Sequence, residues 1–328
     1  MSESYTVTQT NIWWIMLERF LEWLKVKNYS PKTIVIRRRD VGKLIKFLEE
    51  RELVEPREIT LSHLERYQAY LANYLTKKNK HLQADTQGRI LTALKVFFRY
   101  LAKEKYLTFN PATEIECPKI PSRLPKTILS HQEVELIMKQ ADLTTLTGQR
   151  DRAVLELLYS TGIRRAELAN LKLKDLDNGR AMIFVREGKC AKDRCIPIGE
   201  RALAWVERYL REVRPQLVAK SETKVEALFI NQYGEGFSID GIANVVEKYV
   251  SKAGIGKRGA CHIFRHTMAT LMLENGADIR YIQQMLGHTD IATTQIYTQV
   301  SDRMLREVHS QTHPGAKLFS KKYSSPDK

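Results

Sequence analysis

With 328 residues, 43% of them hydrophobic, the chain is long enough to build two ordinary globular cores. Its 53 Lys and Arg residues against 38 Asp and Glu give a formal charge of +15, which favours nucleic acid as the partner. No stretch approaches the roughly 18 uninterrupted apolar residues of a membrane-spanning helix, and no signal-peptide pattern opens the chain, so we expect a cytoplasmic protein without a membrane partner. The four cysteines form no C-x-x-C pair, which argues against structural zinc and a disulfide framework.

The first third of the chain predicts a bundle of four helices. They are expected at Asn11 to Asn28, from Pro31 with Ser30 as its cap, from about Thr60, and from about Ala84 to Tyr106. An apolar stripe on the first helix is assigned to the core: Trp13, Trp14, Leu17, Phe20, Leu21 and Leu24. The fourth helix is expected to bury Ile90, Leu91, Leu94, Phe97, Phe98 and Leu101.

A proline-rich segment follows this bundle. Residues 111–126 contain Pro111, Pro118, Pro121 and Pro125, which block a regular helix and stiffen an extended connection. We therefore predict a helical domain at 1–110, a linker at 111–126 and a second domain at 127–328.

The second domain is expected to be mostly helical with a small β-hairpin or sheet. Ser130 and Glu133 form a capping-box pattern, and a further helix is predicted at 149–159, before the turn at 160–162. Two short strands are predicted at 181–186 and 194–198, joined by a hairpin, and helices dominate after Ser238. The fold class expected for the whole chain is mainly α.

Three segments of this domain concentrate ordered polar residues: TGIRRAEL at 161–168, GKCAKDR at 188–194 and CHIFRH…LGH…IYT at 261–298. A phosphodiester under in-line attack gains charge on its non-bridging oxygens, which rigid guanidinium donors such as Arg164 and Arg265 can stabilise. Tyr297 can hold the cut strand covalently, and Lys189 can protonate the leaving oxygen. Together the segments predict a site that acts on a phosphodiester.

These segments resemble the tyrosine recombinase or phage integrase family, and its Xer-like site-specific recombinases, over most of the second domain. The resemblance implies six catalytic residues: Arg164, Lys189, His262, Arg265, His288 and Tyr297. It also implies supporting roles for Glu167 beside the site and for Gly162 in the turn. The stretches NYSPKT and LTALKVFFRYL of the first domain resemble the family's DNA-clamping domain less specifically.

The activity implied by this resemblance is DNA recombination. Strands would be cut and rejoined through a 3′-phosphotyrosine and a Holliday junction, without metal or cofactor. The partners would be a double-stranded recombination site and three further copies of the chain, as a tetramer on two DNA sites, with accessory proteins left open. The two domains would form a C-shaped clamp, and the tail after Tyr297 would contact a neighbouring protomer. The DNA sequence and the biological role, whether chromosome resolution, transposition or phage integration, are left open.

Two departures from the family pattern fall beside the expected site. Cys190 stands where the family usually has Gly after the lysine, so the hairpin geometry is in question and Lys192 is the substitute for Lys189. Cys261 stands where the family often has Pro, a change from which we expect little consequence. His262 and His266 have the spacing of a zinc pair, but Ile263 stands where a metalloprotease would have Glu, and we expect no metal.

Two other functions remain as alternatives. The segment 277–300 predicts two short helices around Leu286-Gly287-His288, which also fits a helix-turn-helix regulator without catalysis. A type IB topoisomerase would use similar chemistry to relax supercoils. The regulator has no need for the catalytic set, and the Xer-like spacing favours recombination over relaxation. Basic side chains of the first domain are candidates for contacts to the DNA backbone: Arg37, Arg38, Arg39, Arg89, Lys95 and Arg99.

Overall fold

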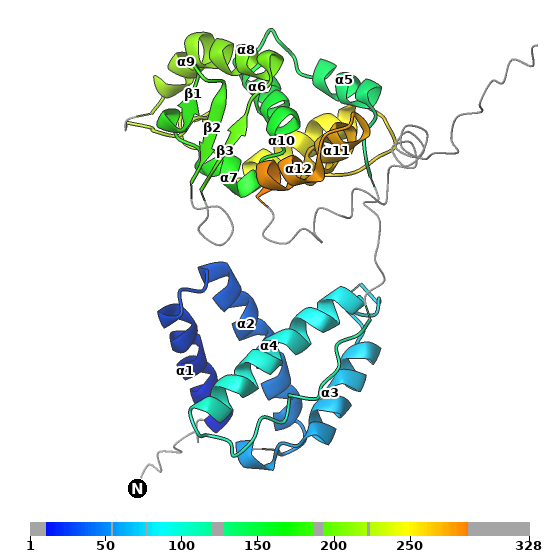
Figure 1. Cartoon of the computed structure of the whole chain (residues 1–328). Helices are drawn as coiled ribbons and strands as arrows, with labels where there is room; N and C mark the ends of the chain where they lie inside the picture. Colours follow the sequence, from blue (N-terminus) through cyan, green and yellow to red (C-terminus); the bar gives the residue numbers. More distant parts are fainter. Residues whose placement is uncertain are drawn as a thin grey trace, which may run out of the picture. The chain divides into compact units, whose positions relative to one another are not determined.

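The computed structural model describes residues 11–53, 55–76, 78–119, 127–186, 193–221 and 224–287. The chain divides into two compact units, Met1–Ser122 and Arg123–Lys328, each with its own hydrophobic core (Figure 1). Both units are mainly helical and the second contains a small antiparallel sheet, which confirms the expected fold class. Within the described ranges, no helix combines the length and apolar character needed to cross a bilayer.

The described part of the first unit is a helical bundle. Its helices are α1 (Ile12–Val26), α2 (Pro31–Glu49), α3 (Leu61–Asn73) and α4 (Ala84–Lys103), with a short 3-10 turn at Pro56–Glu58. α2 begins as expected, because the Ser30 hydroxyl accepts the backbone N–H of Thr33 at 3.2 Å. The apolar stripes expected on α1 and α4 form the core, with one exception. Trp14 lies at the edge of its stripe, and its indole N–H donates to Glu49 at 2.8 Å.

α4 ends at Lys103, before the expected Tyr106. Lys105 adopts a left-handed φ of 62°, and the chain turns back so that Leu107 is buried against the bundle. The segment expected to be a linker contributes to the same core, since Ala112 is 0% exposed and Ile115 is 2% exposed. The bundle is therefore closed by residues from its own C-terminal extension.

The second unit places a three-stranded antiparallel sheet beside a set of helices. Its elements are α5 (His131–Lys139), α6 (Leu146–Thr161), α7 (Arg165–Asn170), β1 (Leu176–Asp177), β2 (Met182–Val185), β3 (Arg194–Pro197), α8 (Glu200–Arg208), a π-helical turn (Tyr209–Val213), α9 (Arg214–Val218), α10 (Ile239–Lys252), α11 (His262–Glu274) and α12 (Ile279–Leu286), with a 3-10 turn at Leu173–Asp175. The Ser130–Glu133 capping box is present, with the Glu133 carboxylate accepting the Ser130 backbone N–H at 2.7 Å.

The centre of this unit is α6, which contacts α8 on one side and α11 on another. β2 and β3 pair antiparallel with Ile183 opposite Ile196, as expected for the two strands, and β1 adds a third strand that sequence patterning did not predict. α12 contacts both α11 and β3. This packing brings the end of α6, the start of β3 and the end of α12 to one place, although they are far apart in the sequence (Figure 1).

Candidate active site

The turn after α6 is fixed by Gly162. This residue has a left-handed φ of 58°, and its N–H closes the helix by donating to the Leu158 carbonyl at 3.0 Å. A Cβ at this position would overlap the terminal methyl group of Met268, so any larger residue would also displace that side chain of α11. Ile163 is buried directly after the turn, and Arg164 then becomes the N-cap residue of α7. The first expected motif is therefore a sharp turn that delivers Arg164 to a defined position.

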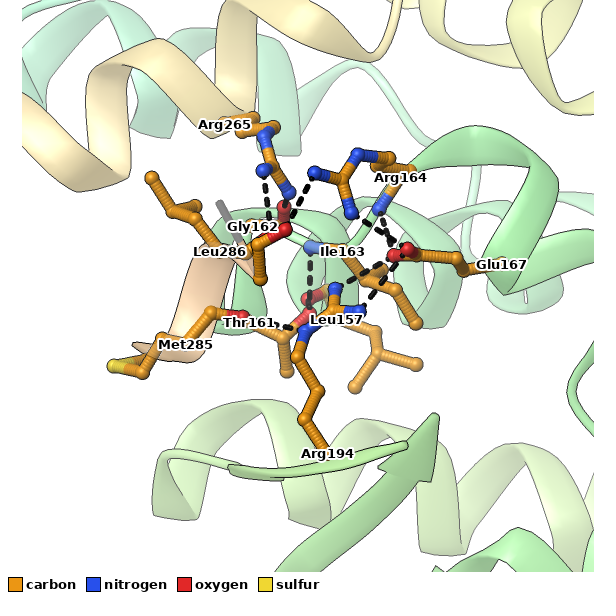
Figure 2. A network of polar contacts seen from close by, with 11 residues as sticks. Leu157, Thr161, Gly162, Ile163, Arg164, Glu167, Arg194, Arg265, Met285 and Leu286 are labelled. Atoms are coloured by element: carbon orange, nitrogen blue, oxygen red, sulfur yellow. Dashed lines mark hydrogen bonds and ion pairs between the residues drawn. The ribbon is translucent and has the colours of Figure 1, made fainter. Parts of the chain in front are cut away.

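The Glu167 carboxylate holds Arg164 in place (Figure 2). One of its oxygens accepts the Arg164 Nη1 at 2.8 Å, and the other accepts the Arg164 backbone N–H at 3.0 Å. Arg194, at the start of β3, donates Nη1 and Nη2 to the same two oxygens at 3.0 and 2.7 Å. Burial alone would raise the pKa of Glu167, but the hydrogen bonds from Arg194 and Arg164 lower it below its ordinary value. Glu167 is therefore ionised and holds the guanidiniums of Arg164 and Arg194 together through hydrogen bonds.

The second expected arginine, Arg265, is buried on α11. Its Nη1 donates to the Gly162 carbonyl at 2.7 Å and its Nη2 to the Leu286 carbonyl at 2.6 Å. The guanidinium of Arg265 thus contacts both the turn that positions Arg164 and the end of α12.

The last carbonyl groups of α12 accept hydrogen bonds from three arginines that come from three different segments (Figure 2). The pairs are Arg194 Nε to Met285 at 2.9 Å, Arg265 Nη2 to Leu286 at 2.6 Å, and Arg164 Nη2 to Gly287 at 3.0 Å. The carbonyls at a helix C-terminus lack intrahelical partners and carry the negative end of the helix dipole, which explains why cations gather there. Because consecutive carbonyls accept from Arg164 and Arg265, these two guanidiniums lie side by side.

The electrostatic balance of this cluster favours an anion. Three guanidiniums, those of Arg164, Arg194 and Arg265, gather around the one carboxylate of Glu167, so these four side chains together carry more positive than negative charge. His262 lies on α11 one helical turn before Arg265 and is accessible to solvent. Desolvation, together with the charges of Arg265, Arg165 and Arg164, lowers the pKa of His262. This shift favours the neutral form of its imidazole.

His266 lies on the same helix as His262, with ring centroids 6.4 Å apart. Burial lowers the pKa of His266, and the neighbouring His262 and Arg265 lower it further. No cluster of three or more metal-ligating side chains occurs among the described residues. Cys261 is buried at the start of α11, and burial raises the pKa of its thiol to about 11.

Three expected site residues, Lys189, His288 and Tyr297, lie outside the described residues. The same holds for Cys190 and Lys192, and for the second helix of the helix-turn-helix alternative. The structure therefore brings together Arg164, Arg265, His262, Glu167 and Gly162 from the expected set.

The basic residues expected to contact DNA lie on α2 and α4 of the first unit. Arg38 is half-exposed and pairs with Glu18 at 2.6 Å, while Arg39 and Arg89 both pair with the buried Asp40. Arg37 is partly buried, and this burial lowers its pKa. Arg99 is exposed and Lys95 is partly exposed on α4. Several of these side chains therefore have protein partners as well as access to solvent.

Sequence reasoning missed Arg194, although it is the last residue of the quoted GKCAKDR segment. Alternation along a strand places residue 194 on the same side as residue 196, and Ile196 is fully buried. A charged side chain on the inward side of a strand requires a buried partner of opposite charge. Glu167 is that partner, and the Arg194 side chain is only 8% exposed.

Comparison with known proteins supplies the family. Residues 127–304 match the model of the phage integrase family, and residues 16–108 match the N-terminal SAM-like domain of phage integrases. Tyrosine recombinase XerC 2 of Ralstonia nicotianae is 49% identical over 298 residues, which covers 91% of this chain and 85% of the relative. Tyrosine recombinase XerD of Staphylococcus epidermidis is 36% identical, covering 92% of this chain and 99% of the relative.

The chain belongs to the phage integrase family of tyrosine recombinases. It is an enzyme for site-specific recombination, which cleaves and rejoins DNA through a tyrosine intermediate. This assignment sets aside the alternatives of a regulator without catalysis and of a topoisomerase.

Solved structures agree with the family fold. The XerA recombinase is 33% identical, with a TM-score of 0.51 and coverage of 92% of this chain and 99% of that chain. The XerH site-specific recombinase, in a post-cleavage complex with a palindromic difH substrate, is 24% identical with a TM-score of 0.69, covering 90% and 83%. The likeness to XerH concerns the fold alone.

Proposed function

We propose that Arg164 and Arg265 bind the phosphate at which this recombinase cuts DNA. The proposal is based on their hydrogen bonds to adjacent carbonyls at the end of α12, which bring two guanidiniums from distant segments together. Permanently charged planar donors suit a phosphate whose non-bridging oxygens gain charge in the transition state. Hydrogen bonds to backbone carbonyls position the two guanidiniums in the absence of DNA. Donors that are positioned in advance stabilise a transition state more effectively, so we assign the pair a role in catalysis as well as in binding.

The proposed reaction uses Tyr297 as the nucleophile. Its oxygen forms a bond to the phosphorus on the 3′ side of the cut while the bond to the 5′ oxygen breaks. Lys189 gives a proton to the leaving 5′ oxygen, and a neutral imidazole at His262 can take the phenol proton or donate a hydrogen bond to the phosphate. His288 completes the proposed set. Attack by a second 5′ hydroxyl on the phosphotyrosine reverses these steps and rejoins the strands.

The proposed substrate is a double-stranded recombination site, held between the first unit as the DNA-clamping domain and the second unit as the catalytic domain. The net charge of +15 supports this polyanionic partner. The XerH structure named above contains a difH substrate, which supports a comparable duplex site here. We further propose that the protein forms a tetramer on two such sites and exchanges strands through a Holliday junction. Sedimentation of the protein bound to DNA with two sites measures the size of this assembly.

A nicked duplex tests the mechanism, because the short cleaved end diffuses away and traps the covalent intermediate. We expect a covalent adduct between the protein and the 3′ phosphate in the presence of EDTA, and none with Tyr297→Phe. Arg164→Ala and Arg265→Ala should each slow cleavage by about 10²- to 10³-fold, the usual loss for one transition-state donor. Their DNA affinities should change far less than their cleavage rates.

Tyr297→Phe is also the control for binding, since loss of the phenol oxygen leaves the charge of the protein unchanged. An adduct that persists in this variant would reject Tyr297 as the nucleophile. Adduct formation that requires magnesium would reject the metal-free mechanism.

A further inference from the structure

Arg194 occupies a position that no role in the proposed mechanism explains. It is the first residue of β3, and its side chain is 8% exposed. Its guanidinium donates two hydrogen bonds to the carboxylate of Glu167 and a third, from Nε, to the carbonyl of Met285 (Figure 2). One side chain therefore joins three separate segments of the second unit: β3, α7 and the end of α12.

Both partners of Arg194 lie close to groups proposed to act on DNA, Glu167 through hydrogen bonds and Met285 through its position at the end of α12. Glu167 holds both the backbone N–H and the side chain of Arg164. Met285 lies three residues before His288 in the sequence, at the end of the helix whose Gly287 carbonyl also accepts from Arg164. In the other direction along the chain, Arg194 follows Lys189 by five positions. A displacement of this guanidinium would therefore disturb several parts of the site at once.

The packing around Arg194 leaves it little freedom. Gly287 ends α12 with a φ of 61°, and a Cβ at this position would lie 2.9 Å from the Arg194 Nε and 3.0 Å from its Cδ and Cζ. The backbone of the helix end thus lies directly against the guanidinium. Only glycine allows this approach, which fixes the distance between β3 and α12.

We propose that Arg194 is a positioning residue for recombination, which aligns Arg164 and the end of α12 through its bonds to Glu167 and Met285. The inference rests on the proposed role of Arg164 at the phosphate. Arg194 itself has no assigned contact with DNA, and its effect on the rate passes through the groups that it holds. A misplacement of reacting groups by about 1 Å can slow an enzyme by about 100-fold.

The chain offers a matched control in Arg150. Its side chain is 7% exposed, it donates two bonds to the buried Asp151, and its Nη1 donates to the Ile230 carbonyl at 3.3 Å. Arg150 and Arg194 therefore have similar burial and similar kinds of partner within the same unit. Only Arg194 is bonded to the site.

The test measures single-turnover cleavage of a nicked duplex at saturating DNA, at a temperature where thermal melting shows each variant folded. Arg194→Ala is expected to slow cleavage by about 100-fold while Arg150→Ala stays near the rate of the unchanged protein. Arg194→Ala combined with Glu167→Gln should be no slower than the slower single variant, because both changes break the same connection. Equal losses for Arg194→Ala and Arg150→Ala, or losses that multiply in the double variant, would overturn the proposal.

Arg194→Lys tests the geometry and replaces the alanine variant if the latter does not fold. Lysine keeps the charge but lacks the planar fork that reaches Glu167 and Met285 together, so we expect a large part of the cleavage defect to remain. Full activity of Arg194→Lys would show that charge alone is needed and would reject positioning.

Arg164→Ala distinguishes a failure of the proposed function from a failure of the proposed role of Arg194. Unimpaired cleavage there rejects the proposed function, whereas a defect there combined with normal cleavage by Arg194→Ala rejects only the role of Arg194.

Discussion

At the scale of single residues, the site depends on one carboxylate whose four hydrogen bonds come from two arginines. Glu167 must stay ionised for this arrangement to hold, and its hydrogen bonds lower its pKa despite burial. A carboxyl group with a lowered pKa in the folded state stabilises the protein above its ordinary pKa, and this contribution is lost as the pH falls through the folded-state pKa. The stability of the second unit should therefore depend on Glu167 in a pH-dependent way.

Glu167→Gln tests this dependence. At neutral pH the change should lower the free energy of unfolding by about 3 to 5 kcal/mol, because it leaves buried arginines without their counter-charge. The difference from the unchanged protein should begin to narrow as the pH falls below the ordinary value of 4.5, where the glutamate of the unfolded chain takes up a proton. It should be lost as the pH falls through the lowered pKa of the folded state, where Glu167 itself becomes protonated. Urea unfolding at a series of pH values measures both free energies. Glu247→Gln, at an exposed position of α10, is the control, and an equal pH-dependent loss there would contradict the assignment.

The general acid can be tested by changing the leaving group. A thiol has a pKa of about 8.5, so sulfur at the 5′ bridging position can leave without the proton that an alkoxide requires. Lys189→Ala should cleave ordinary DNA slowly and recover on the sulfur substrate, while Arg164→Ala should stay defective on both. Rescue of Lys192→Ala instead of Lys189→Ala would transfer the role to Lys192. Cleavage rates on the paired substrates provide the comparison.

At the scale of secondary structure, the site is formed by the ends of elements rather than by their middles. Gly162 ends α6, Arg164 begins α7, Arg194 begins β3 and Gly287 ends α12. Element ends carry unpaired backbone groups and can change direction sharply, which allows segments far apart in the sequence to converge. The consequence is that a small change of backbone at one end should affect the whole cluster.

Gly162→Ala is the corresponding prediction. An alanine would add about 1 to 2 kcal/mol of strain for its left-handed backbone, and its Cβ would also push against Met268 on α11. We expect a fall in thermal stability and a larger fall in cleavage. Gly254 has a matching left-handed φ of 63° with no atom within 4 Å of an added Cβ, so Gly254→Ala isolates the backbone strain. Identical effects of the two changes would show that packing against Met268 is unimportant.

Local patterns predicted most of these elements, because capping residues and apolar periodicity act within a few residues. Ser30, the Ser130–Glu133 box and the stripe on α4 all behave as the sequence indicates. The early end of α4 and the role of Arg194 were not predicted, since both depend on partners distant in the sequence. Leu107 turns back onto the bundle, and Arg194 finds Glu167 twenty-seven positions earlier. The family resemblance predicted the two arginines, Arg164 and Arg265. The carbonyl groups that accept their hydrogen bonds could be identified only from the folded structure.

At the scale of the whole molecule, charge should dominate the first encounter with DNA. A protein that makes about 6 to 10 phosphate contacts loses about 10³ to 10⁵ in affinity between about 50 and 200 mM salt, because binding releases condensed counterions. We expect the dissociation constant for a duplex recombination site, measured by fluorescence anisotropy, to rise by a factor in this range over the same salt interval. Tyr297→Phe should show the same dependence of affinity on salt as the unchanged protein. A flat response to salt would contradict a DNA interface built on the +15 charge.

Ala112 and Ile115 complete the core of the first unit, and this determines where the chain can be fused to part of another recombinase. A chimaera that takes its DNA-clamping part from this chain and its catalytic part from a relative is an obvious route to new target sites. A junction at residue 110 would leave both apolar side chains behind and open the bundle, at a cost of about 2 to 5 kcal/mol for the isoleucine position alone. A junction beyond residue 119 keeps the core intact. A chimaera that exchanges DNA-site specificity between recombinases must therefore take the proline-rich segment together with the helical bundle whose core it completes.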